Sequence, residues 1–275
     1  MTDLLLLLSR STIAAHNEFL ALARNTVYNM AYETQQYVTS LVLTQIKPPN
    51  VWWSSDYKTL TCEGYTCSMD DLRSGIQGVF ARCWELYDEI TGGRRFATKL
   101  PEHFEDDLTM QGRGYSFLFH GPYTDHPHSF LIYLCSDECK WDIGSVHGNQ
   151  MSWNIPNLRN FLALTAELNK NLSVLCFLCP AVSTRVSEFL ASKYTNDSRL
   201  RTLCMMIDEM VHLSTYHKMT NQTGLDICTP AFYPGALKDL MLEYLAGGLR
   251  DCETLLSEYA YGKEASMQYS RCVMF

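Results

Sequence analysis

The chain has 275 residues, and its 22 basic and 30 acidic residues give a formal net charge of −8. This acidic balance argues against a protein that grips nucleic acid tightly, because such binding needs many Lys and Arg side chains to neutralise phosphates. Only 19% of the residues are charged while 47% are hydrophobic. Much of the surface must therefore be hidden, either in a large core or against other copies of the chain.

The cysteines and the amino-terminal residues indicate an intracellular location. There are 11 cysteines, an odd number, scattered along the chain. The five leucines that follow Asp3 are fewer than the roughly 7–15 apolar residues of a secretory signal. No stretch of the sequence approaches the ~20 apolar residues of a membrane span. We therefore expect a cytoplasmic protein without a membrane partner, whose thiols are reduced and mostly buried.

Residues 1–50 are predicted to form a long N-terminal helical segment that lies at an oligomer interface. No Gly or Pro interrupts residues 12 to 47, and apolar residues recur at steps of three and four. These apolar positions are Leu20, Ala23, Val27, Met30, Ala31, Val38, Leu41, Val42 and Ile46. Pro48 and Pro49 then end the helix. A helix of ~35 residues would be about 50 Å long, although two helices broken near Asn25 would also fit the pattern.

The next elements are a loop and a helix. The residues after Trp53, up to residue 69, are interpreted as a loop. A helix is predicted over residues 70–90, with Asp70 or Asp71 as its N-cap and Gly92–Gly93 after its end. Its expected apolar stripe consists of Leu72, Ile76, Val79, Phe80, Cys83 and Leu86. Residues 101–110 are predicted to form a short helix that Pro101 opens.

The pattern then changes to two apparent strands. Residues 115–120 and 129–135 are rich in aromatic and aliphatic side chains, which favours strands joined as a hairpin by the loop between them. Residues 136–155 are interpreted as irregular. The sequence after Pro156 again indicates helices, with the apolar residues 172–179 as one buried strand. The predicted helices span 156–169, 180–194, 198–217, 230–245 and 249–261.

These elements predict a mainly α protein of the α+β class. We expect a single helical domain with a small β-hairpin element, in addition to the N-terminal helical segment. The boundary is placed after residue 50, so that residues 51–275 form the mainly helical core domain. The sequence contains no repeat, low-complexity tract or flexible linker that would indicate a second domain.

The densest chemical motif lies in the predicted hairpin loop. His120, Asp125, His126 and His128 are within nine positions of one another, and histidine and carboxylate groups are common ligands of transition metals. His126 and His128 would point to the same side of an extended chain, with Asp125 or His120 as a third ligand. The same residue types also serve turn chemistry in a solvated loop. We take the loop as a turn and predict no metal site.

Cys176 and Cys179 have the C-x-x-C spacing and precede Pro180. A redox pair needs an accessible loop and a lowered thiol pKa at a helix N-terminus. The residues around this pair are apolar throughout, which favours two buried structural cysteines instead.

Glu209 and His212 would share one face of the predicted helix 198–217, as in half of a di-iron site. Such a site needs a second E-x-x-H motif, and the sequence has none. The phosphate-loop, dinucleotide, serine hydrolase and zinc hydrolase motifs are also missing. The sequence therefore yields no catalytic, cofactor-binding or metal-binding residues.

Residues 20–60 resemble the helical coat proteins of small double-stranded RNA viruses of the partitivirus type. The likeness lies in the general pattern of "NMAYETQQYVTSLVLTQIKPPNVWW", an expected helix followed by a proline turn and tryptophans, and involves no fixed motif. The chain is also shorter than most such coat proteins. The resemblance implies a structural capsid subunit that forms dimers and closed homo-oligomers, located in the cytoplasm and in the virion. It would enclose RNA without sequence-specific binding.

The alternative is a cytoplasmic enzyme with a metal or thiol site around His120–His128 or Cys176–Cys179. A third hypothesis is a non-viral helical adaptor protein.

Overall fold

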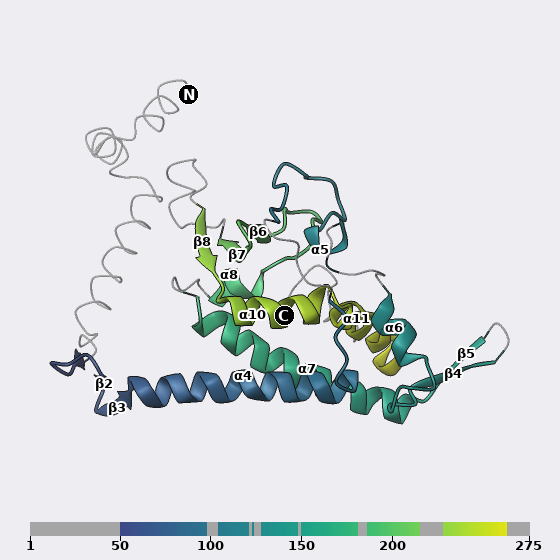
Figure 1. Cartoon of the computed structure of the whole chain (residues 1–275), viewed down its shortest axis with the longest axis horizontal. Coiled ribbons are helices and arrows are strands. Elements are labelled where there is room, and N and C mark those ends of the chain that lie inside the picture. Colours follow the sequence, from purple (N-terminus) through teal and green to yellow (C-terminus); the bar gives the residue numbers. More distant parts are fainter. Residues whose placement is uncertain are drawn as a thin grey trace, which may run out of the picture. The chain divides into compact units, whose positions relative to one another are not determined.

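The computed structural model of the chain (Figure 1) describes residues 50–97, 104–120, 123, 128–147, 150–180, 186–214 and 228–262. These residues form helices and small antiparallel sheets, which confirms the predicted α+β class. The predicted N-terminal helical segment lies outside the described residues, apart from Asn50. The chain divides into two compact units, residues 1–72 with 221–223, and residues 73–220 with 224–275.

The described part of the first unit contains a three-stranded antiparallel sheet. Its strands are β1 (Val51–Trp53), β2 (Thr59–Cys62) and β3 (Tyr65–Ser68), in that order. Glu63 and Gly64, between β2 and β3, have φ angles of 50° and 85°. Positive φ at both central residues is what a two-residue type I′ hairpin turn requires. The prediction of a loop after Trp53 was therefore wrong.

Helix α4 (Met69–Thr91) confirms the helix predicted over residues 70–90. Its N-cap differs from the prediction, because the Oγ of Ser68 accepts from the backbone N–H groups of Asp70, at 3.1 Å, and Asp71, at 3.3 Å. The carboxylates of Asp70 and Asp71 instead lie in the first turn, where their negative charge interacts favourably with the positive end of the helix dipole. Gly92 and Gly93 follow the helix with φ angles of 66° and 79°, as predicted.

The two predicted strands at residues 115–120 and 129–135 are helical. They contain α5 (Phe117–His120) and α6 (Ser129–Leu134). Phe130, Tyr133 and Leu134 are buried at the i, i+3, i+4 spacing of a helix, so packing has overridden their β-propensity. The short helix predicted over residues 101–110 is also wrong where it is described, since residues 104–110 contain a single turn and no helix.

Helix α7 (Ile155–Leu178) joins the predicted helix 156–169 to residues that we had expected to form a buried strand. Before it, β4 (Gly144–His147) and β5 (Gln150–Trp153) pair as a hairpin within the stretch interpreted as irregular. Within the described ranges, α7 is the one helix long and apolar enough to cross a membrane. Its buried residues belong to the hydrophobic core of the second unit, however, and core helices share both of those properties.

The largest error concerns residues 198–217, which were predicted as a helix. Here β6 (Leu203–Met206) and β7 (Glu209–Ser214) form a hairpin, and β8 (Thr229–Phe232) pairs with the other side of β7. The turn residues Ile207 and Asp208 have φ angles of 50° and 64°. A β-branched residue seldom adopts positive φ, so Ile207 does not indicate a turn at this point.

The described part of the second unit contains three further helices. α8 (Val186–Leu190) is shorter than the helix predicted over residues 180–194, and residues 191–194 after it are not helical. α10 (Gly235–Leu245) begins later than predicted, since residues 229–232 form β8. α11 (Leu249–Tyr261) has the predicted bounds.

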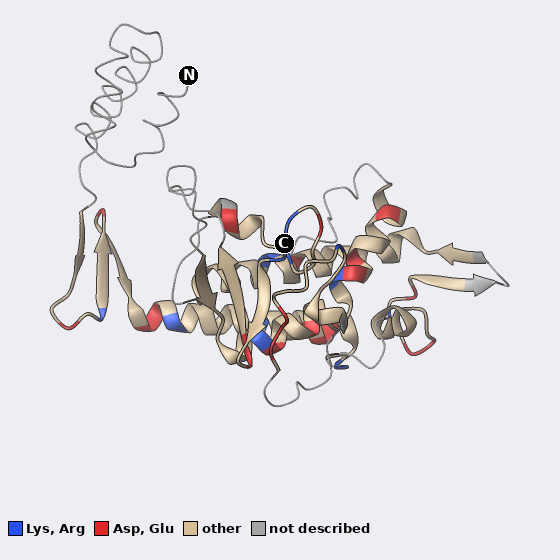
Figure 2. Ribbon diagram, turned by 90° about the horizontal axis from the view of Figure 1, so that it is seen from above, with Lys and Arg blue, Asp and Glu red and all other residues tan. Residues whose placement is uncertain are grey.

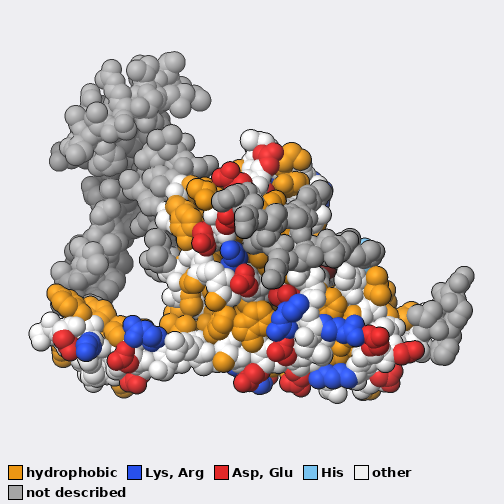
Figure 3. Space-filling model, in the orientation of Figure 1, with side chains coloured by type: hydrophobic (Ala, Val, Ile, Leu, Met, Phe, Trp, Pro, Cys, Tyr) orange, Lys and Arg blue, Asp and Glu red, His pale blue; other side chains and the backbone are white. Residues whose placement is uncertain are grey.

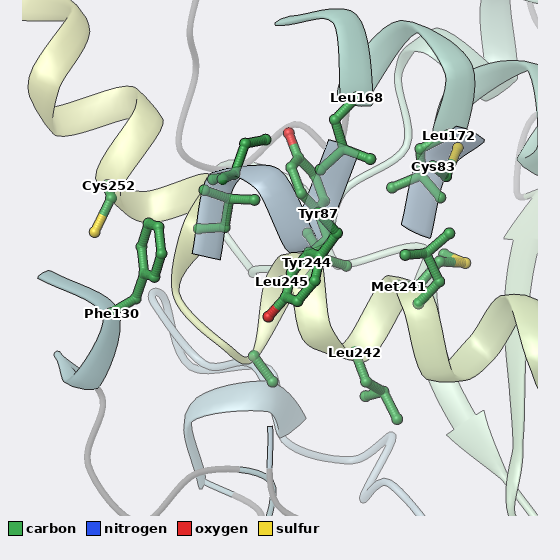
Figure 4. Close-up of a cluster of buried hydrophobic side chains, with 14 of the residues drawn as sticks. Cys83, Tyr87, Phe130, Leu168, Leu172, Met241, Leu242, Tyr244, Leu245 and Cys252 are labelled. Atoms are coloured by element: carbon green, nitrogen blue, oxygen red, sulfur yellow. The ribbon is translucent and has the colours of Figure 1, made fainter. Parts of the chain in front are cut away.

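The core of the second unit lies between α4, α7, α10 and α11. Figure 4 shows side chains from these elements meeting in one cluster, among them Tyr87, Leu172 and Met241, all at most 1% exposed. One polar contact is built into the same region. The Tyr87 hydroxyl donates to Glu243 Oε2 at 2.6 Å, and that oxygen also accepts from the backbone N–H of Phe96 at 3.0 Å. The buried carboxylate thus ties α4 and the chain after it to α10.

Candidate interaction surface

The predicted histidine loop is only partly described. Residues 121–122 and 124–127, including Asp125 and His126, lie outside the described residues. His128 precedes α6, is exposed, and makes no side-chain cap of that helix. Within the described ranges, no group of three or more His, Cys, Asp or Glu residues could hold a metal ion. The nature of this loop stays a prediction.

Cys176 and Cys179 lie in and just after the last turn of α7, at the opposite helix end from that of a redox pair. Cys176 is 1% exposed, and its Sγ lies 3.5 Å from Met241 Sδ. Burial raises the pKa of the Cys176 thiol well above its ordinary value, and it also raises that of Cys179. Neither environment favours a thiolate. The burial predicted for Cys176 is confirmed, whereas Cys179 is half-buried.

Thiol labelling is expected to distinguish exposed from buried cysteines among the described residues. Cys135 and Cys228 of the second unit are exposed and should react with a bulky maleimide within minutes in the native protein. Cys83, Cys176, Cys204 and Cys252 are buried and should react only when the protein unfolds. Mass spectrometry of peptides after a short pulse measures this. Rapid native labelling of Cys176 would contradict the arrangement described here.

His212 lies on β7 instead of on a helix, so Glu209 and His212, three apart, point to opposite faces of the sheet. The His212 side chain is 1% exposed, and its Nε2 lies 2.9 Å from the Oγ of Ser192. Ser192 donates its only hydroxyl proton to the carbonyl oxygen of Phe189 at 2.5 Å. The imidazole must therefore donate from Nε2, which leaves Nδ1 unprotonated and without a hydrogen-bond partner among the described residues.

This Ser–His pair is not arranged for nucleophilic catalysis. A serine nucleophile has to donate its proton to the histidine, whereas here the histidine donates to the serine. Both side chains are also buried, with Ser192 fully inaccessible. Burial lowers the pKa of His212 to about 4. The imidazole is therefore neutral at pH 7, and the pair links residues after α8 to the sheet.

A second buried cluster connects the loop before α5 to the segment between α8 and β6. The Arg201 guanidinium binds Asp106 in a bidentate ion pair, with Nε–Oδ2 at 2.9 Å and Nη2–Oδ1 at 2.7 Å. Its other N–H groups donate to the backbone carbonyls of Met110 and Asp107 and to Asn196 Oδ1. The Tyr115 ring lies 4.7 Å from the guanidinium carbon. All the donors of this arginine are thus used inside the protein, which makes the cluster structural.

The sheet of the first unit has one wholly apolar face. Residues directly opposite one another in the β1–β2–β3 register point to the same side, as do residues two apart on a strand. This rule places six apolar residues together, which we call the sheet face: Val51, Trp53, Leu60, Cys62, Tyr65 and Cys67. The opposite face carries Thr59, Thr61, Thr66 and Ser68 with Trp52.

The sheet face is largely open to solvent. Trp53 is 46% exposed and Tyr65 83% exposed, while Val51, Cys62 and Cys67 are also exposed and Leu60 is half-buried. An antiparallel sheet ordinarily packs its apolar face on a core. The alternation of Thr with Leu, Cys and Tyr around Glu63–Gly64 was a sequence signal for this hairpin, and our reading of the segment as a loop missed it.

The second unit carries an apolar surface of its own, formed by two helices. Phe177 of α7 and Phe189 of α8 meet with their ring centroids 5.5 Å apart. Beside this contact, α7 and α8 each expose two aliphatic side chains at i, i+4 spacing. These four residues, the helical surface, are Val174 (41% exposed), Leu178 (51%), Val186 (58%) and Leu190 (55%). Figure 3 shows hydrophobic side chains gathered over this end of α7.

Charged side chains do not form a basic surface on the described elements. Figure 2 shows Lys and Arg residues scattered along them, with Asp and Glu residues interspersed. Several of the arginines are paired with carboxylates, such as Arg82 with Glu167 at 2.9 Å and Arg94 with Glu138. Comparisons with known proteins give no further guide, since no family model, curated protein or solved structure matches the chain.

Proposed function

We propose that the chain is a self-assembling structural protein, and more specifically a capsid subunit that encloses RNA in the manner of double-stranded RNA virus coats. The observation that carries the assembly is the exposure of two apolar surfaces, the sheet face and the helical surface. Soluble monomers rarely leave contiguous apolar patches of more than a few hundred Å² uncovered. Copies of the same chain are the commonest cover for such patches.

Two different surfaces on one chain also bear on the kind of assembly. A single self-complementary patch closes a dimer, whereas a second patch lets each copy contact further neighbours. Closed shells need such a second contact. The scattered basic side chains (Figure 2) suit enclosure of RNA without tight or sequence-specific binding. The proposal that the assembly is a capsid rests on the resemblance of residues 20–60 to the coat proteins of double-stranded RNA viruses.

The test is the size of the purified full-length protein, measured by size-exclusion chromatography with light scattering and by electron microscopy. We expect large closed particles that protect RNA from added nuclease. Leu178→Asp combined with Leu190→Asp should reduce the particles to smaller species, because each carboxylate would have to be buried at the contact. Ala166→Asp, at an exposed position of the same helix, is the matched control and should assemble normally. A compact monomer at micromolar concentration would overturn the proposal and favour the enzyme alternative.

A further inference from the structure

The sheet face needs a cover. Three short strands with one apolar face are stable when that face packs against another layer, and a helix is the usual second layer on a sheet. The sheet face contains no charged residue, and Trp53 and Tyr65 offer large flat rings to such a layer. The tilted ring contact between Trp53 and Tyr57, with centroids 6.5 Å apart, leaves Trp53 46% exposed.

The sequence provides a matching layer immediately before β1. Residues 20–46 carry apolar side chains at helical spacing, with one Arg, Arg24, and one Glu, Glu33, so their net charge is zero. Only residues 47–50 separate this segment from the sheet. We propose that the sheet face of each copy binds residues 20–46 of a second copy. This inference rests on the self-assembly proposed above and assigns its contact.

The connection between the two parts favours exchange between copies. Pro48 and Pro49 fix their own φ near −65°, and each disfavours the helical conformation of the residue before it. Two consecutive prolines extend the chain by about 3.1 Å per residue, so they oppose the tight reversal that would bring residues 20–46 back onto the sheet of their own copy. Short, stiff hinges of this kind promote the exchange of an element between identical copies.

A direct pairing of two sheet faces explains the surface less well. From the exposed fractions of its large side chains, the sheet face offers on the order of 400 Å². A stable interface takes about 800 Å² from each partner. If two copies exchange residues 20–46, the sheet face of each copy is buried. The apolar side chains of residues 20–46 are covered as well. One contact then removes both apolar surfaces of the first unit from water.

Cys62 and Cys67 allow a test, because both thiols belong to the sheet face and are exposed. Two differently tagged full-length copies are co-expressed. The first carries Leu41→Cys together with Cys62→Ser and Cys67→Ser, and the second keeps the native face. After mild oxidation we expect a disulfide between the thiol introduced by Leu41→Cys and Cys62 or Cys67 of the other tag. A non-reducing gel and peptide mass spectrometry identify it.

Thr39→Cys, two positions away and outside the apolar stripe, is the matched control and should cross-link at least fivefold less. Light scattering of the same samples reports assembly independently of the disulfide. Particles without the Leu41→Cys cross-link would overturn this inference and leave the proposed function intact. If the full-length protein is a monomer, both this inference and the proposed function are wrong. A copy carrying Leu41→Cys with its native face that forms the disulfide within itself, in preference to its neighbour, would show that the segment covers its own sheet and also overturn the exchange.

Discussion

Replacing Asp106 with alanine is expected to lower the free energy of unfolding by roughly 3–5 kcal/mol, the usual effect of removing one partner of a buried ion pair. The Asp106 side chain is fully buried and that of Arg201 is 3% exposed. The alanine variant leaves a guanidinium inside the protein without its counter-charge. The N–H groups of Nε and Nη2 that bonded to Asp106 lose their partner, while the other N–H groups of Arg201 stay bonded to Met110, Asp107 and Asn196.

Urea unfolding followed by tryptophan fluorescence measures this loss. Glu105→Ala is the matched control, since Glu105 is the adjacent acid and is exposed; its effect should stay within about 0.5 kcal/mol. Asp106→Asn is expected to fall between the two, because the amide oxygen keeps one hydrogen bond from the guanidinium. A loss of less than about 1 kcal/mol in Asp106→Ala would mean that the pair is open to solvent.

The helices that were predicted correctly are those whose signals are local. For α4 these signals are the apolar spacing, the acidic first turn and Gly92–Gly93. α11 likewise lies between Gly248 and Gly262, both with positive φ. Such caps and periodicities act within a few residues, so the sequence displays them directly.

The errors have a different origin. The strand pair β6–β7 turns at Ile207–Asp208, where the β-branched Ile207 is not a usual turn former. Met205, Met210 and Val211 are buried in this hairpin, but buried residues follow one another in both strands without the alternation that marks a strand in a sequence. For the aromatic residues of α5 and α6 the error was the reverse, because strands were predicted where the structure has helices. Packing against distant elements decides these segments, and a local pattern does not contain that information.

The same limit applies to the candidate sites. Arg201 and Asp106 are 95 positions apart, and Ser192 and His212 are 20 apart, so no motif links them in the sequence. The C-x-x-C motif was visible, and its apolar neighbours correctly indicated a buried Cys176. The sheet face could be predicted from the sequence only in part. Its hairpin could be found from the alternation around Glu63–Gly64, but its exposure could be found only from the structure.

His212 is expected to make the protein less stable as the pH falls from about 6.5 to about 4. Its folded-state pKa is lowered to about 4 from an ordinary value of 6.5, chiefly because burial disfavours the imidazolium. Between these two values the unfolded chain takes up a proton that the folded chain cannot accept. Stability contributed by the neutral histidine is therefore fully present above pH 6.5 and declines below it. The expected loss between pH 7 and pH 4.5 is roughly 2–3 kcal/mol.

Other groups titrate in the same range, so the measurement is a comparison with His212→Gln. Glutamine keeps an N–H donor for Ser192 and has no charge at either pH. Urea unfolding of both proteins at pH 7 and pH 4.5 separates the contribution of His212, because the carboxylates and the other histidines are common to both. We expect the variant to be less stable than the native protein at pH 7 but to lose roughly 2–3 kcal/mol less on acidification. Equal losses in the two proteins would show that His212 takes up its proton in the folded state, which requires that the imidazole reach water or a carboxylate such as Glu188.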